Sequence, residues 1–197
     1  MASQTLVIIV VSALLVFWVV GAYNRLVRLK NTIANAFGQI DVQLKRRYDL
    51  IPNLVEAAKK YLQHERDTLE AVTNARNHAR TASDAVRSRP ANAAAVLTLS
   101  AAEQALSGAL GGLFALAEAY PELKADQTVR DLSEELASTE NKVAFSRQAY
   151  NDAVLDYNNA QSQFPALLVA RLFGFAPSVM LRATESAAER QTMRIQM

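Results

Sequence analysis

The sequence contains no cysteine, which excludes disulfide bonds, thiolate metal sites, cysteine nucleophiles and a lipid-modified cysteine. Glycine and proline are also scarce, with 6 and 5 among 197 residues, whereas good helix formers are abundant. Few helix breakers favour long helices over a sheet with frequent turns. The chain is long enough for one domain with its own core, and we expect that domain to be all-α.

Net charge is small, and a formal charge of +2 does not by itself indicate a nucleic-acid partner. The charges are nevertheless unevenly spread along the chain. Residues 24–60 carry eight Lys or Arg against three acidic residues, whereas residues 103–156 carry ten acidic residues against four basic ones. Helices of opposite charge can pack side by side with little repulsion, although ordinary solvated faces would give the same pattern.

Polar side chains are almost absent near the N-terminus, where Ser12 is the only one between Leu6 and Ala22. With one flanking residue on each side the stretch covers residues 5–23, roughly 29 Å of helix, which matches the hydrocarbon thickness of a bilayer. It predicts a transmembrane helix that follows a short external segment, residues 1–4. The anchoring side chains are expected to be Leu6, Val7, Ile8, Ile9, Leu14, Leu15, Phe17, Trp18 and Val19.

Basic residues follow this stretch directly, at Arg25, Arg28 and Lys30. Positive charge tends to stay on the cytoplasmic side, so we expect the N-terminus outside and the body in the cytoplasm, in a single-pass protein of the cell membrane. A cleaved signal peptide is the alternative. It would begin with a basic segment, and Met-Ala-Ser-Gln-Thr carries no charged side chain.

Beyond the stretch, apolar side chains recur every three or four residues and repeat every eleven, as at Ile33, Leu44 and Val55, which predicts an amphipathic helix. Pro52 allows two interpretations: one helix kinked there, or a new helix capped by Asp49. The first gives three long helices. We prefer the second, an antiparallel four-helix bundle over residues 24–164 with helices at about 24–48, 50–79, 92–120 and 128–163.

The sequence also indicates where the helices of this bundle begin and end. Residues 80–91 are polar, lack an apolar stripe and are predicted to form a loop, and Pro121 is expected to end the third helix. Thr128 with Asp131 resembles a capping box that opens the last helix. Apolar residues seven apart in that helix indicate coiled-coil packing: Leu136, Val143, Tyr150, Tyr157 and Phe164. Such a core needs no metal or cofactor, and we predict neither.

Two regions are candidates for contact with a partner. Glycines inside the third helix each cost about 1 kcal/mol relative to alanine, which indicates either close approach of a neighbouring backbone or a local kink. Residues 165–181 are apolar but too short and interrupted to span a membrane; they fold back on the bundle, or lie on the membrane surface or a partner. Residues 182–197 are predicted to be a polar tail. The candidate interaction surface comprises Gly108, Gly111, Gly112, Leu172, Phe173 and Phe175.

Candidates for catalysis are few. Position 68 after His64 is Thr and not the second histidine of a zinc-protease helix, and neither His64 nor His78 has the Glu three residues earlier that a di-iron bundle uses. Both histidines are expected on solvated faces. A hard cation could be held by carboxylates from several helices, although pairing with Lys or Arg is the commoner arrangement; the candidates are Glu56, Glu103, Glu118 and Glu140.

Three long motifs, in this order, cover nearly the whole chain and resemble the LemA family of bacterial membrane proteins. They are YNRLVRLKNTIANAFGQIDVQLKRRYDLIPNLV (23–55), LGGLFALAEAYPELKA (110–125), and TENKVAFSRQAYNDAVLDYN with the later FP and FGFAP (139–177). The resemblance implies an anchor in the bacterial inner membrane, a short external N-terminus and a four-helix antiparallel cytoplasmic body. It implies no catalytic residue. The sequence departs from the family pattern at Gly38, Gly112 and Ala176, where Ala, Arg and Lys are common.

The preferred functional hypothesis is a non-enzymatic, membrane-anchored scaffold that binds a second copy of itself or a membrane-protein partner; no small-molecule substrate is expected. The alternative is a protein that senses or shapes the membrane surface through residues 166–181 and the basic residues after the anchor. A metal-dependent enzyme is a remote alternative, because the sequence offers no recognisable arrangement of nucleophile and base.

Overall fold

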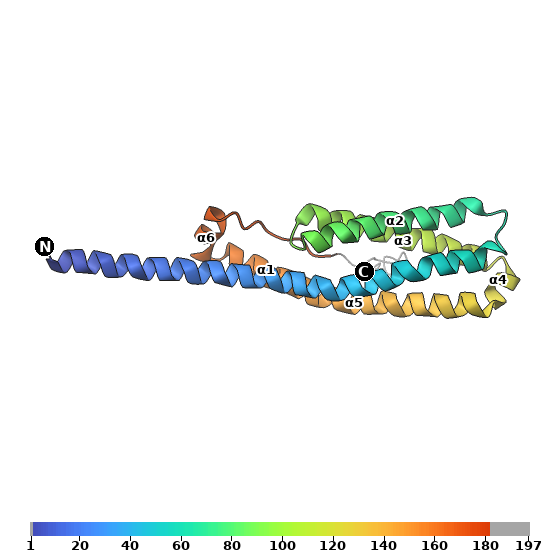
Figure 1. Ribbon diagram of the computed structural model, residues 1–197, viewed down its shortest axis with the longest axis horizontal. Helices are drawn as coiled ribbons and strands as arrows, with labels where there is room; N and C mark the ends of the chain where they lie inside the picture. The colour runs from blue at the N-terminus through green and yellow to red at the C-terminus, as the bar shows by residue number, and fades with distance from the viewer. Residues whose placement is uncertain (1, 182–197) are drawn as a thin grey trace, which may run out of the picture.

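A computed structural model describes residues 2–181 of the chain, and these residues form helices and connecting segments without any strand. The all-α class expected from the sequence is therefore confirmed for this part. In Figure 1 the N-terminal part of α1 extends alone beyond the other helices. The helices are α1 (Ala2–Lys59), α2 (Arg66–Ser88), α3 (Ala93–Ala117), α4 (Pro121–Ala125), α5 (Gln127–Ser162) and α6 (Ala166–Leu172).

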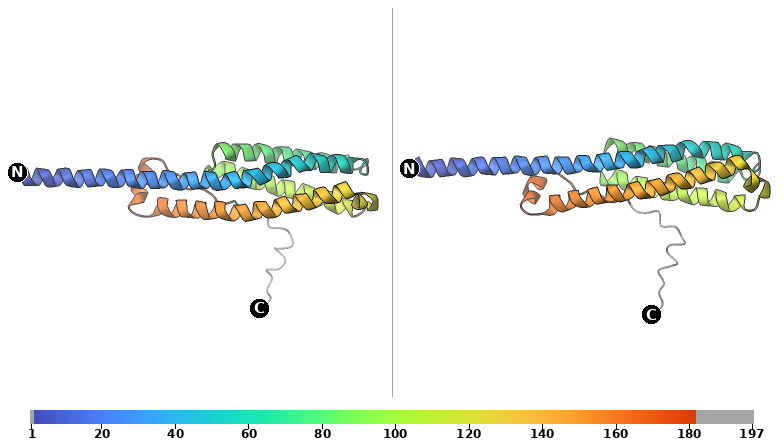
Figure 2. Two further views of the ribbon diagram at one scale, coloured as in Figure 1. Left: turned by 60° about the horizontal axis from the view of Figure 1, so that its bottom comes forward. Right: turned by 90° about the horizontal axis from the view of Figure 1, so that it is seen from below.

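The long helices pack as two pairs, α1 with α5 and α2 with α3, and α1 also contacts α2. Figure 2 shows the same elongated arrangement from two other sides. The apolar stripe predicted along α1 faces the core and includes fully buried Ile33, Phe37, Leu44 and Tyr48. In α5 the residues seven apart are buried at Leu136, Tyr150 and Tyr157, whereas Phe164 lies beyond the helix and is 80% exposed.

Pro52 lies inside α1, which runs without interruption to Lys59. The interpretation that Asp49 caps a new helix at residue 50 is therefore wrong. The helix continues through Pro52, as the alternative held, but it ends at Lys59, so the three long helices of that alternative are not observed. Proline has no N–H to donate to the carbonyl four residues earlier, which is that of Tyr48. The Arg76 Nε of α2 donates to this carbonyl oxygen at 2.8 Å, so the bond lost within the helix is replaced by one between helices.

The second helix also differs from the prediction. The chain turns at residues 60–65, and α2 then continues to Ser88 through most of the predicted loop at 80–91. This segment does have a buried stripe, but it is made of small side chains: Ala79, Ala82, Ser83 and Val86. Small residues bury little area each, so the apolar periodicity was too weak to identify the helix.

Side-chain caps fix two of the other helix starts. Asn92 Oδ1 accepts a hydrogen bond from the Ala95 N–H at 2.9 Å, which starts α3 where the sequence predicted it. The cap of α5 is Asp126, whose Oδ1 accepts from the Val129 N–H at 3.1 Å, and not Thr128. Pro121 occupies the first turn of the short helix α4, a position where no intrahelical donor is lost.

We expect Arg76→Leu to lower the free energy of unfolding by about 1–3 kcal/mol, because the Tyr48 carbonyl would be left without a donor. Pro52→Ala restores an N–H that can donate to this same carbonyl, so the loss should be much smaller in that background. Urea unfolding of the unsubstituted protein, both single variants and the double variant measures the coupling. If Arg76→Leu lowered the free energy of unfolding equally with Pro52 and with Ala at position 52, Arg76 would not be replacing the missing helix hydrogen bond.

Candidate functional site

The predicted anchor residues form a continuous exposed apolar surface on α1. All of them are exposed except Val19, which is half-buried. By length and composition two helices of the described chain could cross a membrane, α1 and α3; none of the apolar window of α1 is buried, against 22% of that of α3. A long apolar surface that none of the described residues covers is typical of a contact with a membrane or another protein.

The C-terminal segment packs against α1 just where the predicted anchor ends. Val169 and Ala170 of α6 are buried against Leu26, and Val19 and Ala22 pack on the same cluster. The segment therefore folds back on the helices, as one of the two alternatives predicted, and it does so at the end of the body nearest the anchor (Figure 1).

A tight turn after α6 brings two aromatic rings onto Tyr23. Gly174 has φ +71°, a conformation that favours glycine, and the Phe175 N–H donates to the Ala170 carbonyl at 2.9 Å, which is the Schellman pattern of a helix end. The rings of Phe173 and Phe175 then lie edge-on to Tyr23, with centroids 5.0 and 5.5 Å away. Three aromatic side chains thus meet at the junction of anchor and body.

The glycines of α3 lie elsewhere, on the exposed side of that helix. A Cβ placed at Gly108, Gly111 or Gly112 would meet nothing within 4 Å, so the close backbone neighbour that was one of the two alternatives is not supplied by residues 2–181. They are not brought together with Leu172, Phe173 and Phe175, and the candidate interaction surface therefore consists of two separate areas. The glycine area adjoins the exposed Leu97, Ala101 and Ala105 of the same helix.

A buried polar cluster links α1, α2 and α3. Arg47, with a side chain only 4% exposed, donates to Glu103 Oε2 at 2.8 Å and to Ser107 Oγ at 3.2 Å. The Tyr48 hydroxyl donates to the other Glu103 oxygen. Burial raises the pKa of Glu103, and the neighbouring Arg47 and Tyr48 offset only part of that rise. The cluster is fully paired, which is the arrangement expected of a structural core.

A second buried carboxylate, Asp41, joins α1 to α2. It accepts two hydrogen bonds from the Arg87 guanidinium, at 2.8 and 2.9 Å, and one from Ser83 Oγ at 3.2 Å. Burial tends to raise the pKa of Asp41, but the bonds from Arg87 and Lys45 outweigh it and the pKa lies below its usual value. The sequence prediction missed this site because Arg87 lay in the supposed loop.

The other titratable candidates are on the surface. His64 and His78 are exposed, as expected. Glu56 and Glu118 face Lys59 and Lys124, and Glu140 lies 4.0 Å from Arg47. The four glutamates are thus not gathered in a common interior, and no group of three metal-ligating side chains occurs within residues 2–181.

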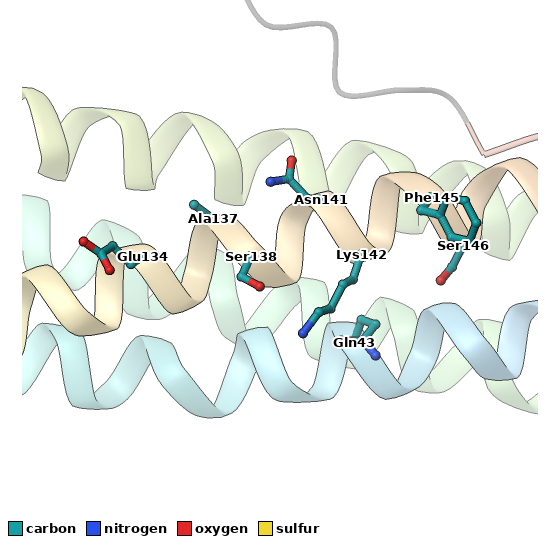
Figure 3. A pocket seen from close by; sticks show the side chains of 8 residues that line it. All are labelled: Gln43, Glu134, Ala137, Ser138, Asn141, Lys142, Phe145 and Ser146. Atoms are coloured by element: carbon teal, nitrogen blue, oxygen red, sulfur yellow. The ribbon is translucent and has the colours of Figure 1, made fainter.

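A shallow hollow runs along the outer side of α5 next to Gln43 of α1 (Figure 3). Most of its lining side chains are themselves exposed, including Lys142 and Phe145. Figure 3 shows Lys142 extending toward Gln43 while Asn141 points away from it. The hollow is open to water, so it lacks the enclosed, mostly apolar form of a small-molecule site. It is lined by Gln43, Glu134, Ala137, Ser138, Asn141, Lys142, Phe145 and Ser146.

Comparison with known proteins agrees with the resemblance noted in the sequence. The model of the LemA family matches residues 36–197, a range that begins in the body part of α1. Protein LemA of Metamycoplasma hominis is 26% identical over 169 residues, which are 86% of this chain and 73% of that protein. Since the family match extends over far more than half of the sequence, the chain belongs to the LemA family.

Proposed function

We propose that this protein is a non-enzymatic scaffold: an anchored antiparallel four-helix body, held at the cytoplasmic face of the membrane with its N-terminus outside, that binds a second copy of itself. The observation that supports the proposal is that the exposed side of α3 carries no charged residue. Glu103 is the single charged residue in α3, and it points inward to Arg47. The exposed side of this helix is thus uncharged.

The exposed side of α3 also contains many small residues. Small exposed residues lie along it at Ala94, Ala101, Ala105, Gly108, Gly112 and Ala115, the first two seven apart and the others four or three apart. Leu97 and Phe114 beside them are 50% and 37% exposed. Small side chains allow two helix backbones to approach closely, and identical uncharged faces do not repel one another. A second copy of the chain therefore fits this face.

Anchoring adds a geometric reason for pairing between copies. Two copies held in one membrane have the same orientation and a raised local concentration. A two-fold axis along the membrane normal then brings α3 of one copy against α3 of the other, as an isologous contact. Retention of the anchor is supported by its packing, since loss of residues 1–23 would remove Val19, Ala22 and Tyr23 from beneath α6.

Cysteine substitution tests the α3 contact without interference, because the chain has no cysteine of its own. In a parallel two-fold pair each α3 residue near the axis meets its own copy, so Gly108→Cys and Gly112→Cys should give covalent dimers when native membranes are oxidised. Leu155→Cys, an exposed position on α5, is the control and should stay monomeric. Monomer in both α3 variants, or equal dimer in the control, would refute the contact.

A membrane-surface role is the second candidate, and the packing of α6 at the end of the anchor favours it. Enzymatic activity is not proposed, because the buried glutamate of the body, Glu103, is committed to hydrogen bonds with Arg47 and Tyr48.

A further inference from the structure

Four large apolar side chains around α6 are mostly exposed in the part of the chain that the structure describes, residues 2–181. Phe164 and Leu172 are 80% and 77% exposed, and Leu168 and Phe173 are more than half exposed. The opposite side of α6 is buried on α1 and α5. We call these four residues the collar. Single exposed apolar residues are ordinary, but four on one short segment indicate a contact surface.

The position of the collar identifies the occupant. Phe173 of the collar contacts Tyr23, the last residue of the predicted span, and α6 packs beside Val19 and Ala22 within that span. If residues 5–23 cross the bilayer, the collar lies at the depth where hydrocarbon gives way to lipid headgroups. Aromatic and aliphatic side chains at this depth partition favourably out of water.

The charges around the collar fit an anionic lipid surface. Arg25, Arg28 and Lys30 of α1 and Arg171 of α6 are all exposed. Neither residues 2–40 nor residues 157–181 contain an acidic residue, so this end of the described protein carries cations alone. Basic side chains next to an apolar insertion are the usual composition of interfacial membrane segments.

From this geometry we propose that the collar inserts into the cytoplasmic leaflet around the anchor, with acyl chains against its apolar side chains and lipid phosphates at the flanking arginines. The inference rests on the proposed membrane anchor. It adds a second membrane contact that fixes the body against the bilayer surface, so the body does not swing freely on a single helix.

Tryptophan fluorescence in vesicles of phosphatidylethanolamine and phosphatidylglycerol with brominated acyl chains tests this insertion, because bromine quenches tryptophan only at close range. Trp18, in the anchor, is the single tryptophan of the chain and reports on the span. Trp18→Phe removes it, and Phe164→Trp then places a probe in the collar. Phe145→Trp in the same background is the matched control, since Phe145 is also 80% exposed but lies about 28 Å along α5 from residue 164.

We expect quenching and a blue-shifted emission for Phe164→Trp, approaching the quenching of Trp18, and neither effect for Phe145→Trp. Leu172→Trp gives an independent second probe should Phe164→Trp fold poorly. Quenching of Trp18 without quenching at either collar position would refute insertion of the collar but not the membrane anchor. An unquenched Trp18 in the unsubstituted protein would overturn the anchor itself, and the collar with it.

Discussion

Arg47→Met is expected to lower the free energy of unfolding by about 3–5 kcal/mol, because it leaves Glu103 as a buried carboxylate without its cation. The Arg47 side chain is 4% exposed and that of Glu103 is 14% exposed, so water cannot replace the lost partner. In a domain of this size the loss corresponds to a fall in melting temperature on the order of 10 °C. Circular dichroism of the detergent-solubilised protein measures it.

The neighbouring Arg46 provides a matched control. It pairs with Glu135, but both side chains are at least one-third exposed, and exposed ion pairs contribute about 0–1 kcal/mol. Arg46→Met should therefore have little effect. Arg47→Met combined with Glu103→Leu should recover most of the stability, because a buried ion pair can be replaced by apolar groups at little cost. A double variant as unstable as Arg47→Met alone would contradict this explanation.

The loss caused by Arg47→Met should also depend on pH. Burial already holds the pKa of Glu103 above its usual value, and removal of the cation raises it further. A carboxyl group with a raised pKa binds more protons in the folded than in the unfolded protein, so folding is favoured as the pH falls through that pKa. The loss should be smaller at about pH 5 than at about pH 8; an unchanged loss would show that packing, and not charge, is responsible.

Asn151→Ala combined with Asn158→Ala is expected to release the end of the described chain from α5. The Asn158 side chain both donates to the Ser178 carbonyl and accepts from the Ser178 N–H, at 2.8 and 2.9 Å. Asn151 does the same with Leu181, at 3.1 and 2.9 Å. Each asparagine thus satisfies both backbone groups of one residue, and Ser178 and Leu181 are buried.

A lost bond to a buried backbone group costs about 1–3 kcal/mol, and each 1.4 kcal/mol is about tenfold in an equilibrium constant. Amide hydrogen exchange at Ser178 and Leu181 should therefore accelerate by at least about tenfold in the double variant. Exchange in the buried part of α1 should change little. Asn159→Ala, an exposed neighbour on α5, is the control. Unchanged exchange at Ser178 would show that other contacts hold the segment.

The sequence predicted the features that rest on large apolar side chains. The stripe along α1 and the extents of α3 and α5 within a few residues follow from periodic burial of leucine, isoleucine and aromatic residues, and the exposed apolar helix at the N-terminus follows from an apolar run without a polar face. The C-terminal part of the second helix was missed because its buried residues include the small Ala79, Ala82 and Ser83. Whether the helix continues through Pro52 depends on the hydrogen bond from Arg76 to the Tyr48 carbonyl. Arg76 lies 24 positions after Pro52, and local sequence patterns carry no information about such a partner.

The candidate surfaces were predicted unevenly. Packing of the C-terminal segment on the helices was one of two predicted alternatives, whereas the exposure of the α3 glycines was not predicted. The position of α6 on residues 19–29 depends on the turn at Gly174, which the sequence pattern did not reveal. The collar residues Phe164 and Leu168 were missed. A signal was present, because Phe164, Leu168 and Leu172 follow at steps of four, but Pro165 seemed to end the helical pattern.

The unbroken course of α1 has a mechanical consequence. Its 58 residues form a stiff rod of roughly 87 Å, of which about 54 Å lies beyond residue 23. If residues 5–23 cross a bilayer as proposed, a tilt of about 20°, common for helices in membranes, displaces the far end of the rod sideways by roughly 18 Å. A span longer than the local hydrocarbon thickness is accommodated partly by tilting, and a larger tilt would move residues 60–65 and 118–126 further sideways over the membrane surface.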